Sequence, residues 1–290
     1  MLIFVDYLRH NWDPVLVQTI KTEAGEKDNK AISGLTILDE ELFILSERSS
    51  EVEVYDSTKL TFSRRWNMRE LINPWDIGSC DRNKCLYIFD CKGSSAEILR
   101  VDPNGNLIKK WSTGKDYGRL SVTGDSNIIL TGVKTLKEYS PDGQLVRELN
   151  LSSDASILAP SRAIKLANGQ FMVSHGSGDA ELHRVCVVDA AGKLQKSFGE
   201  KRGSAITQMD CPVYFVVDGN GFVMVADRRN SRVLLLDSDL TFKREILSKE
   251  KHGFRDVNRI LLDEPSGRLF VSDNDWHSTK KDGRILVFSF

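Results

Sequence analysis

The sequence lacks any run of apolar residues long enough to cross a membrane, which takes about 18 such residues. Its apolar start, MLIFV, is followed at once by Asp6 and Arg9, so it is too short for a secretory signal peptide. The chain has only five cysteines, and Cys80, Cys85 and Cys91 are not spaced as the CxxC pairs of a zinc site. We therefore expect reduced thiols in a soluble, cytoplasmic protein.

Neither sign of charge is in excess. The formal net charge is -1, so any affinity for nucleic acid must come from a local patch. The sequence also lacks a nucleophile elbow, a P-loop and an HExxH segment. We therefore expect no enzymatic activity in this chain, no cofactor and no bound metal.

What the sequence does contain is an internal repeat of about 45 residues. Each unit has a short segment rich in aliphatic and aromatic residues, such as CLYIFD (85–90) or FVMVAD (222–227). A second such segment follows, as in EILRVD (97–102) and RVLLLD (232–237), and a turn such as DPNG (102–105) leads to a third. Apolar β-branched and aromatic residues bounded by turn residues are typical of β-strands.

With one more strand ahead of each set, every unit predicts a four-stranded antiparallel blade of a β-propeller. The last unit stops before its outer strand, and PVLVQTI (14–20) fits the missing place. We expect residues 14–21 to close the ring as that outer strand, because an open edge strand invites aggregation. The prediction is an all-β, six-bladed propeller over residues 1–290 as a single domain, with blades at about 32–66, 74–111, 118–149, 160–198, 212–247 and 257–290.

One loop carries a family resemblance. In DRRNSR, Asp227 ends the second strand of its blade, and Asn230 and Arg232 lie at the start of the third. Asp273 and Arg284 take similar places in the last blade. This pattern resembles the NHL repeat, and the chain is similar to the C-terminal propeller of tripartite-motif (TRIM-NHL) proteins. We expect a structural role for the Asp and Arg, because a charged hydrogen bond fixes loop geometry firmly.

The resemblance implies an interaction domain. NHL propellers of this kind recognise the substrates of ubiquitin ligases, and some bind single-stranded RNA. We expect a protein partner, with single-stranded RNA as the alternative, and no membrane or DNA partner. Nothing in the sequence resembles a RING, B-box or coiled coil, so the chain is either a propeller-only adaptor or the C-terminal part of a larger product.

The alignment of the blades places candidate binding residues on one face of the ring. The starts of the innermost strands bring to the channel mouth Asp76, Arg119, Arg162, Tyr214 and Arg259. The loops between second and third strands surround them with Lys92, Arg228, Arg229, Trp276 and Lys280. Arginine and aromatic side chains anchor protein interfaces and also bind single-stranded nucleic acid. Alternatively, each arginine pairs with a carboxylate and only fixes a loop.

The alternative function is that of a metal-dependent enzyme. Six-bladed relatives include lactonases and a peptide-amidating lyase, which hold a divalent metal at the channel mouth. His175, His183 and His277 lie on the same face and could supply ligands. Their spacing is irregular, and three arginines at the mouth would repel a cation. The sequence therefore favours the interaction domain.

Overall fold

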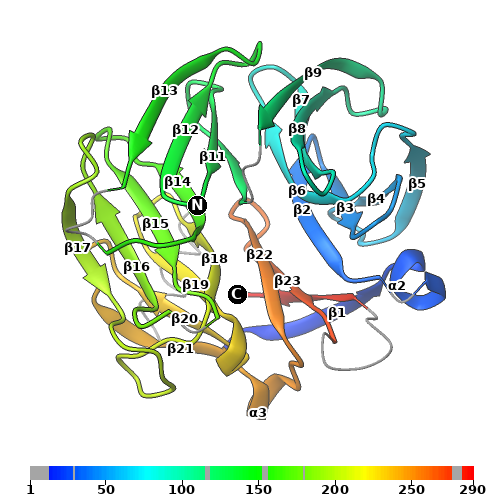
Figure 1. Cartoon of the computed structure of the whole chain (residues 1–290). Coiled ribbons are helices and arrows are strands. Elements are labelled where there is room, and N and C mark those ends of the chain that lie inside the picture. Colours follow the sequence, from blue (N-terminus) through cyan, green and yellow to red (C-terminus); the bar gives the residue numbers. More distant parts are fainter. Residues whose placement is uncertain (1–12, 29, 115–117, 152–155, 179, 276–282) are drawn as a thin grey trace.

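The computed structural model describes residues 13–28, 30–114, 118–151, 156–178, 180–275 and 283–290. These residues form a ring of six sheets around a central channel (Figure 1). Each sheet has four antiparallel strands, and in five of the six sheets the strands follow one another in chain order. The prediction of an all-β, six-bladed propeller is thus confirmed.

The strands of the first three blades are short and end at tight turns. The first blade holds β2 (Ile32–Leu38), β3 (Glu41–Ser46), β4 (Glu51–Asp56) and β5 (Phe62–Asn67). The second blade holds β6 (Pro74–Cys80), β7 (Cys85–Cys91), β8 (Ala96–Val101) and β9 (Leu107–Gly114). The third blade holds β10 (Leu120–Val122), β11 (Ile128–Thr131), β12 (Thr135–Tyr139) and β13 (Leu145–Asn150).

The other three blades repeat this plan. The fourth blade holds β14 (Pro160–Lys165), β15 (Phe171–His175), β16 (Arg184–Val188) and β17 (Leu194–Phe198). The fifth holds β18 (Pro212–Val217), β19 (Val223–Asp227), β20 (Arg232–Leu236) and β21 (Phe242–Ser248). The sixth holds β22 (Val257–Asp263), β23 (Arg268–Asp273) and β24 (Arg284–Ser289). The helical segments are short: α2 (Glu23–Asp28), the 3-10 turn η2 (Arg228–Asn230) and α3 (Lys249–His252).

The sixth blade takes its outer strand from the start of the described chain. Strand β1 (Val15–Lys21) pairs antiparallel with β24, from Val15 opposite Ser289 to Lys21 opposite Arg284. The predicted closure of the ring is therefore confirmed, and β24 has a neighbour on both sides.

The apolar core lies between the blades. Middle strands pack on both faces against neighbouring blades, so β7 and β19 are buried along their whole length. Outer strands such as β9 are mostly exposed. This explains why the middle strands are continuous apolar runs while the outer strands carry many lysines and arginines.

Two further expectations concern the environment of the chain. All five cysteines are buried free thiols. No helix in the part of the chain that the structure describes has the length and apolar character needed to span a bilayer.

Candidate functional site

The innermost strands each bring one residue to the same level of the central channel. In five blades a β-bulge near the start of the strand precedes this residue, and a bulge re-aims the side chain beside it. In the third blade, Arg119 lies just before β10, and its carbonyl accepts a hydrogen bond from the Thr131 N–H, 3.2 Å. The first blade contributes Gly34, which has no side chain. The other five residues form what we call the channel layer: Asp76, Arg119, Arg162, Tyr214 and Arg259.

The ring of Tyr214 is the centre of this layer. The guanidinium carbon of Arg162 stacks over it, 3.8 Å from the ring centroid, and those of Arg259 and Arg119 lie at 5.2 and 5.9 Å. A cation over an aromatic face is attracted by the ring quadrupole, more so when both groups are shielded from water. Burial raises the pKa of Tyr214 above its usual range, so its hydroxyl stays protonated and can donate a hydrogen bond.

Asp76 is the carboxylate of the channel layer. Asp76 Oδ1 lies 3.5 Å from Arg259 Nε, and both residues are almost fully buried. Asp76 Oδ2 accepts from Leu120 N–H at 3.1 Å, and Arg259 Nη2 donates to the Trp75 carbonyl at 2.8 Å. Burial raises the pKa of Asp76 and lowers that of Arg259, while their mutual attraction opposes both changes. The pair connects the second, third and sixth blades.

The other two arginines have no such partner. Arg162 donates from Nε to the Phe215 carbonyl at 3.0 Å and from Nη1 to the Leu120 carbonyl at 3.3 Å. Arg119 donates to Asn258 Oδ1 at 3.4 Å, and its buried Nη1 has no hydrogen-bond partner. Over the described residues, neither guanidinium forms a salt bridge with a carboxylate. The sequence left open that each channel arginine only pairs with a carboxylate. Among the three arginines of the channel layer, this alternative holds for Arg259.

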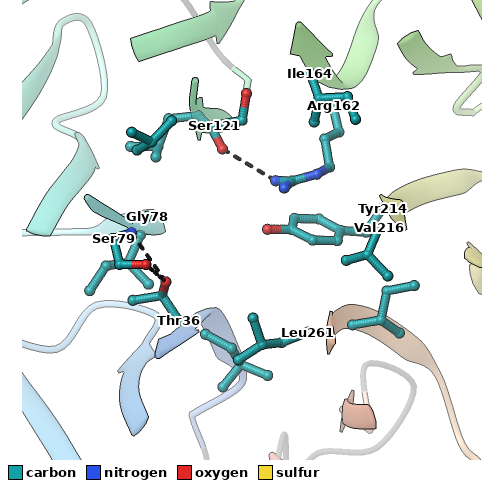
Figure 2. A pocket seen from close by; sticks show the side chains of 14 residues that line it. Thr36, Gly78, Ser79, Ser121, Arg162, Ile164, Tyr214, Val216 and Leu261 are labelled. Carbon is teal, nitrogen blue, oxygen red and sulfur yellow. Dashed lines mark hydrogen bonds between the residues drawn. The ribbon is translucent and has the colours of Figure 1, made fainter. Parts of the chain in front are cut away.

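Two cavities lie along the channel. The upper cavity, about 320 Å³, is at the face that carries the loops between second and third strands, and its lining includes Trp75, Arg119, Ser161, Ser177, Val213 and Arg228. The lower cavity, about 190 Å³, is lined by residues from all six innermost strands (Figure 2). Its polar side chains are those of Thr36, Ser79, Ser121, Arg162 and Tyr214.

A third hollow lies on the loop face beside the upper cavity. This groove, about 610 Å³, is lined by Arg202, Asp210, Arg228, Arg229, Ser231, Arg255 and Asp256, and we call it the arginine groove. The side chains of Arg202 and Arg229 are 42% exposed, whereas that of their common partner Asp210 is 15% exposed. Arg228 holds Asp256 with two nitrogens, Nε to Oδ1 at 2.9 Å and Nη2 to Oδ2 at 3.1 Å, and the Asp256 side chain is 7% exposed. The carboxylates therefore lie deeper than the guanidinium groups.

The Asp and Arg of the NHL-like pattern lie beneath this groove. Asp227 Oδ2 accepts from Arg232 Nε at 2.8 Å and from Asn230 Nδ2 at 2.7 Å, while Oδ1 accepts from Asp210 N–H at 2.7 Å. Burial raises the pKa of Asp227 to about 6, and the bonds from Asn230 and Arg232 limit the rise. In the sixth blade, Asp273 Oδ2 accepts from Arg284 Nε at 2.8 Å. These side chains hold the scaffold of the loop face.

The structure distributes the predicted binding residues over separate places. The channel layer is brought together, but inside the channel: Arg259 is 1% and Tyr214 5% exposed. Its role in binding a partner stays a prediction, and burial restricts it to groups small enough to enter. Arg228 and Arg229 line the arginine groove, and Lys92 forms an ion pair with Glu97 at 2.6 Å in the second blade. Trp276 and Lys280 lie outside the described residues.

The histidines of the alternative function have structural contacts. His175 accepts a hydrogen bond from Arg184 Nε at its Nε2, 3.1 Å, and His183 Nδ1 accepts from Cys211 N–H at 2.9 Å. Burial lowers the pKa of His175 to about 3 and also lowers that of His183. His277 is not among the described residues, and over those that are, no three His, Cys, Asp or Glu side chains converge as a metal site.

The sequence patterns did not indicate all residues of the arginine groove and of the lower cavity. Arg202 and Arg255 lie in the segments that lead into the innermost strands of the fifth and sixth blades, but at different distances from β18 and β22, so the repeat did not align them. Thr36 and Ser79 lie two and three residues beyond the channel-layer positions of their strands, Gly34 and Asp76. Alternation along a strand accounts for Thr36, two residues on, but not for Ser79, and short hydroxyl residues are too common in strands to mark a cavity.

Comparisons with known proteins support the fold. No protein-family model matches the sequence, and no curated protein matches it either. A solved structure of virginiamycin B lyase from Staphylococcus aureus has a TM-score of 0.61 at 11% identity, covering 94% of this chain and 88% of that one. Hydrazine synthase from Kuenenia stuttgartiensis has a TM-score of 0.61 at 12% identity, covering 95% and 90%. A protein of unknown function from Bacteroides caccae has a TM-score of 0.58 at 14% identity, covering 84% and 93%.

These similarities correct one expectation and limit another. The exclusion of enzymatic activity from the lack of a catalytic motif is corrected, because virginiamycin B lyase and hydrazine synthase are enzymes with the same kind of fold. A propeller assembles its sites from residues of several blades, so the lack of a local catalytic motif does not exclude catalysis. At these identities the similarity shows the fold alone. It supports a β-propeller and shows no NHL or TRIM-NHL family.

Proposed function

We propose that this chain is an interaction domain that binds an acidic segment of a protein partner in the arginine groove. The observation that carries this proposal is the arrangement of charge in the groove: four arginines line it, and the carboxylates that face them lie deeper. The role is that implied by the NHL resemblance, recognition of a protein substrate by a regulator of the ubiquitin-ligase type.

The charge of the groove lining supports an anionic ligand. Four guanidinium groups and two carboxylates line the groove, so its lining has two positive charges in excess. Because the guanidinium groups of Arg202 and Arg229 are the most exposed of the set, they meet an incoming group first. Arginine binds carboxylates with a planar fork of N–H donors, so aspartate and glutamate side chains suit it well.

A peptide fits this surface better than single-stranded RNA. Bases bind single-strand proteins by stacking on aromatic faces. Among the described residues that line the groove, none is aromatic. The net charge of -1 also gives no long-range attraction for a polyanion. The five buried free thiols support a reducing, cytoplasmic site of action.

The test compares two charge-reversed variants. Arg202→Glu combined with Arg229→Glu changes the two most exposed groups of the groove. Lys109→Glu combined with Lys110→Glu on the exposed outer strand β9 changes the net charge equally at a distant place. An array of acidic peptides is probed with the purified proteins, and affinities are measured by fluorescence anisotropy.

We expect the groove variant to lose at least about tenfold in affinity, the effect of removing one or two charged hydrogen bonds, and the β9 variant to bind as the wild type. Equal binding by both variants would reject the proposal. Stronger binding of oligo(U) RNA than of any peptide, lost in the groove variant, would replace the protein partner by RNA.

A further inference from the structure

We propose that the lower cavity binds a small organic carboxylate, with Arg162 and Tyr214 as its anchors. This inference is independent of the arginine groove, which lies on the face that carries the loops between second and third strands. It rests on the charge of the channel layer, the hydrogen-bond donors directed at the cavity, and the apolar remainder of the wall.

The channel layer has more positive charge than its carboxylate can balance. It holds three guanidinium groups and one carboxylate, and Asp76 is paired with Arg259. Of the other two guanidinium groups, that of Arg119 lines the upper cavity, whereas that of Arg162 lines the lower cavity and is covered on one side by Tyr214 at 3.8 Å. Removing unpaired charges from water is costly, so a protein gains when a counter-charge enters such a site. A small anion in the channel would supply it.

Hydrogen-bond donors point into the lower cavity. Figure 2 shows the Tyr214 ring and the Arg162 guanidinium projecting into the channel, opposite Thr36 and Ser79. Within the described part of the chain, the Tyr214 hydroxyl makes no hydrogen bond, although the residue is only 5% exposed. Arg162 uses Nε and Nη1 for carbonyl groups, and its Nη2 makes no hydrogen bond to a described residue. Two strong donors are thus available to one ligand group.

The opposite wall adds a third donor. Thr36 donates from its hydroxyl to Ser79 Oγ at 2.9 Å, and its oxygen accepts from the Ser79 N–H at 3.1 Å. Ser79 therefore keeps its own hydroxyl proton for a further acceptor. The Ser121 hydroxyl, by contrast, donates its proton to the Ala163 carbonyl at 2.6 Å.

The size and chemistry of the wall define the rest of the ligand. Polar groups supply more than half of the surface that the cavity presents, and the rest comes from eight aliphatic residues: Leu35, Ile77, Leu120, Val122, Ile164, Val216, Ile260 and Leu261. The volume is about 190 Å³, and a dry apolar cavity of about 150 Å³ holds benzene. A carboxylate on a phenyl ring or a short branched chain therefore matches both the donors and the apolar wall.

The experiment titrates the full chain with sodium benzoate in a low-chloride buffer and follows binding by isothermal titration calorimetry. Tyr214→Phe keeps the ring under Arg162 and removes only the hydroxyl, so it leaves the packing intact. We expect this variant to bind benzoate about tenfold more weakly or worse, because it loses a hydrogen bond to a charged group. Arg162→Gln should abolish detectable binding, and Lys110→Gln on β9 should bind as the wild type.

Two further ligands make the outcome decisive. Benzamide has the shape of benzoate without its charge, and inorganic phosphate has charge without an apolar body. Binding of benzoate that exceeds both, and that weakens in Tyr214→Phe, supports the inference. Equal binding of benzamide, equal or tighter binding of phosphate, unchanged affinity in Tyr214→Phe, or no heat from benzoate at millimolar concentration would each overturn it.

Discussion

Arg232 Nε donates to Asp227 Oδ2 at 2.8 Å, and in the next blade Arg284 Nε donates to Asp273 Oδ2 at the same distance. The other oxygen of each carboxylate accepts a backbone N–H from the segment that leads into the innermost strand, that of Asp210 or Asp256, at 2.7 and 2.8 Å. Each aspartate thus ties together the second strand, the third strand and the incoming connection of its blade. The arginine groove is built on this pair of ties.

We expect Asp227→Ala to lower the free energy of unfolding by about 3–5 kcal/mol, the usual cost of removing one partner from a buried ion pair. The substitution leaves Arg232 Nε and the Asp210 N–H without their acceptor, while the other nitrogens of Arg232 keep the carbonyl groups of residues 204, 205 and 208. Urea unfolding measures the change, and Asp125→Asn, at an exposed position, is the control. A loss below about 1 kcal/mol, the range of exposed ion pairs, would show that the carboxylate is not a structural tie.

The sequence was sufficient to predict the ring and its closure. The continuous apolar runs of the middle strands, exemplified by β7, reflect burial on both faces and recur once per blade. Aligning the innermost strands of the repeats also identified the channel layer. These strands all begin on the same face of the ring and pair with their second strands in the same register, so equivalent residues lie at one level of the channel.

What the sequence could not predict was how deep and how well paired each side chain is. Arg162 and Arg259 occupy equivalent positions, yet only Arg259 reaches Asp76, which is far away in the sequence. Arg228 pairs with Asp256 across two blades. Such pairings depend on rotamers and on the blade that happens to be adjacent in the ring, and neither is encoded in the local repeat.

The buried pair of Asp76 and Arg259 gives a second prediction. Asp76→Ala removes the carboxylate of the channel layer and should lower the free energy of unfolding by about 3–5 kcal/mol. In the double variant Asp76→Leu with Arg259→Met, no unpaired charge remains at this place, so most of that loss should be recovered. A double-mutant cycle of Asp76→Leu, Arg259→Met and the double variant, measured by urea unfolding, provides the coupling energy. Additive effects of the two substitutions would contradict a direct ion pair.

Glu138 in β12 gives a prediction about acid stability. Its carboxylate accepts hydrogen bonds from Asn127, Arg147 and Lys165, each at 2.9 Å, and so connects the third and fourth blades. Burial raises the pKa of Glu138, but these three donors outweigh it and bring the pKa down to about 2. A carboxyl with a lower pKa in the folded state stabilises the fold above its unfolded pKa of about 4.3 and loses that contribution as the pH falls towards 2.

The measurement is urea unfolding at several pH values between 6 and 2, compared with Glu138→Gln. We expect the stability difference between wild type and variant to shrink as the pH falls through this window, because protonated Glu138 offers the same hydrogen bonds as glutamine to a first approximation. A difference that stays constant with pH would mean that the folded-state pKa of Glu138 is not lowered.

The closing strand gives the last prediction. Deletion of residues 1–21 removes β1 together with the buried side chain of Ile20, and it exposes the edge of β24. We expect the melting temperature to fall by about 10 °C, since roughly 3–4 kcal/mol of burial and pairing is lost and each kcal/mol is worth about 3 °C in a domain of this size. The exposed edge should also promote association, visible by light scattering.

A synthetic peptide of residues 13–21 added in excess should restore part of the melting temperature, whereas a scrambled peptide should not. An unchanged melting temperature after the deletion would mean that the sixth blade is stable with three strands and that the ring does not depend on its closing strand.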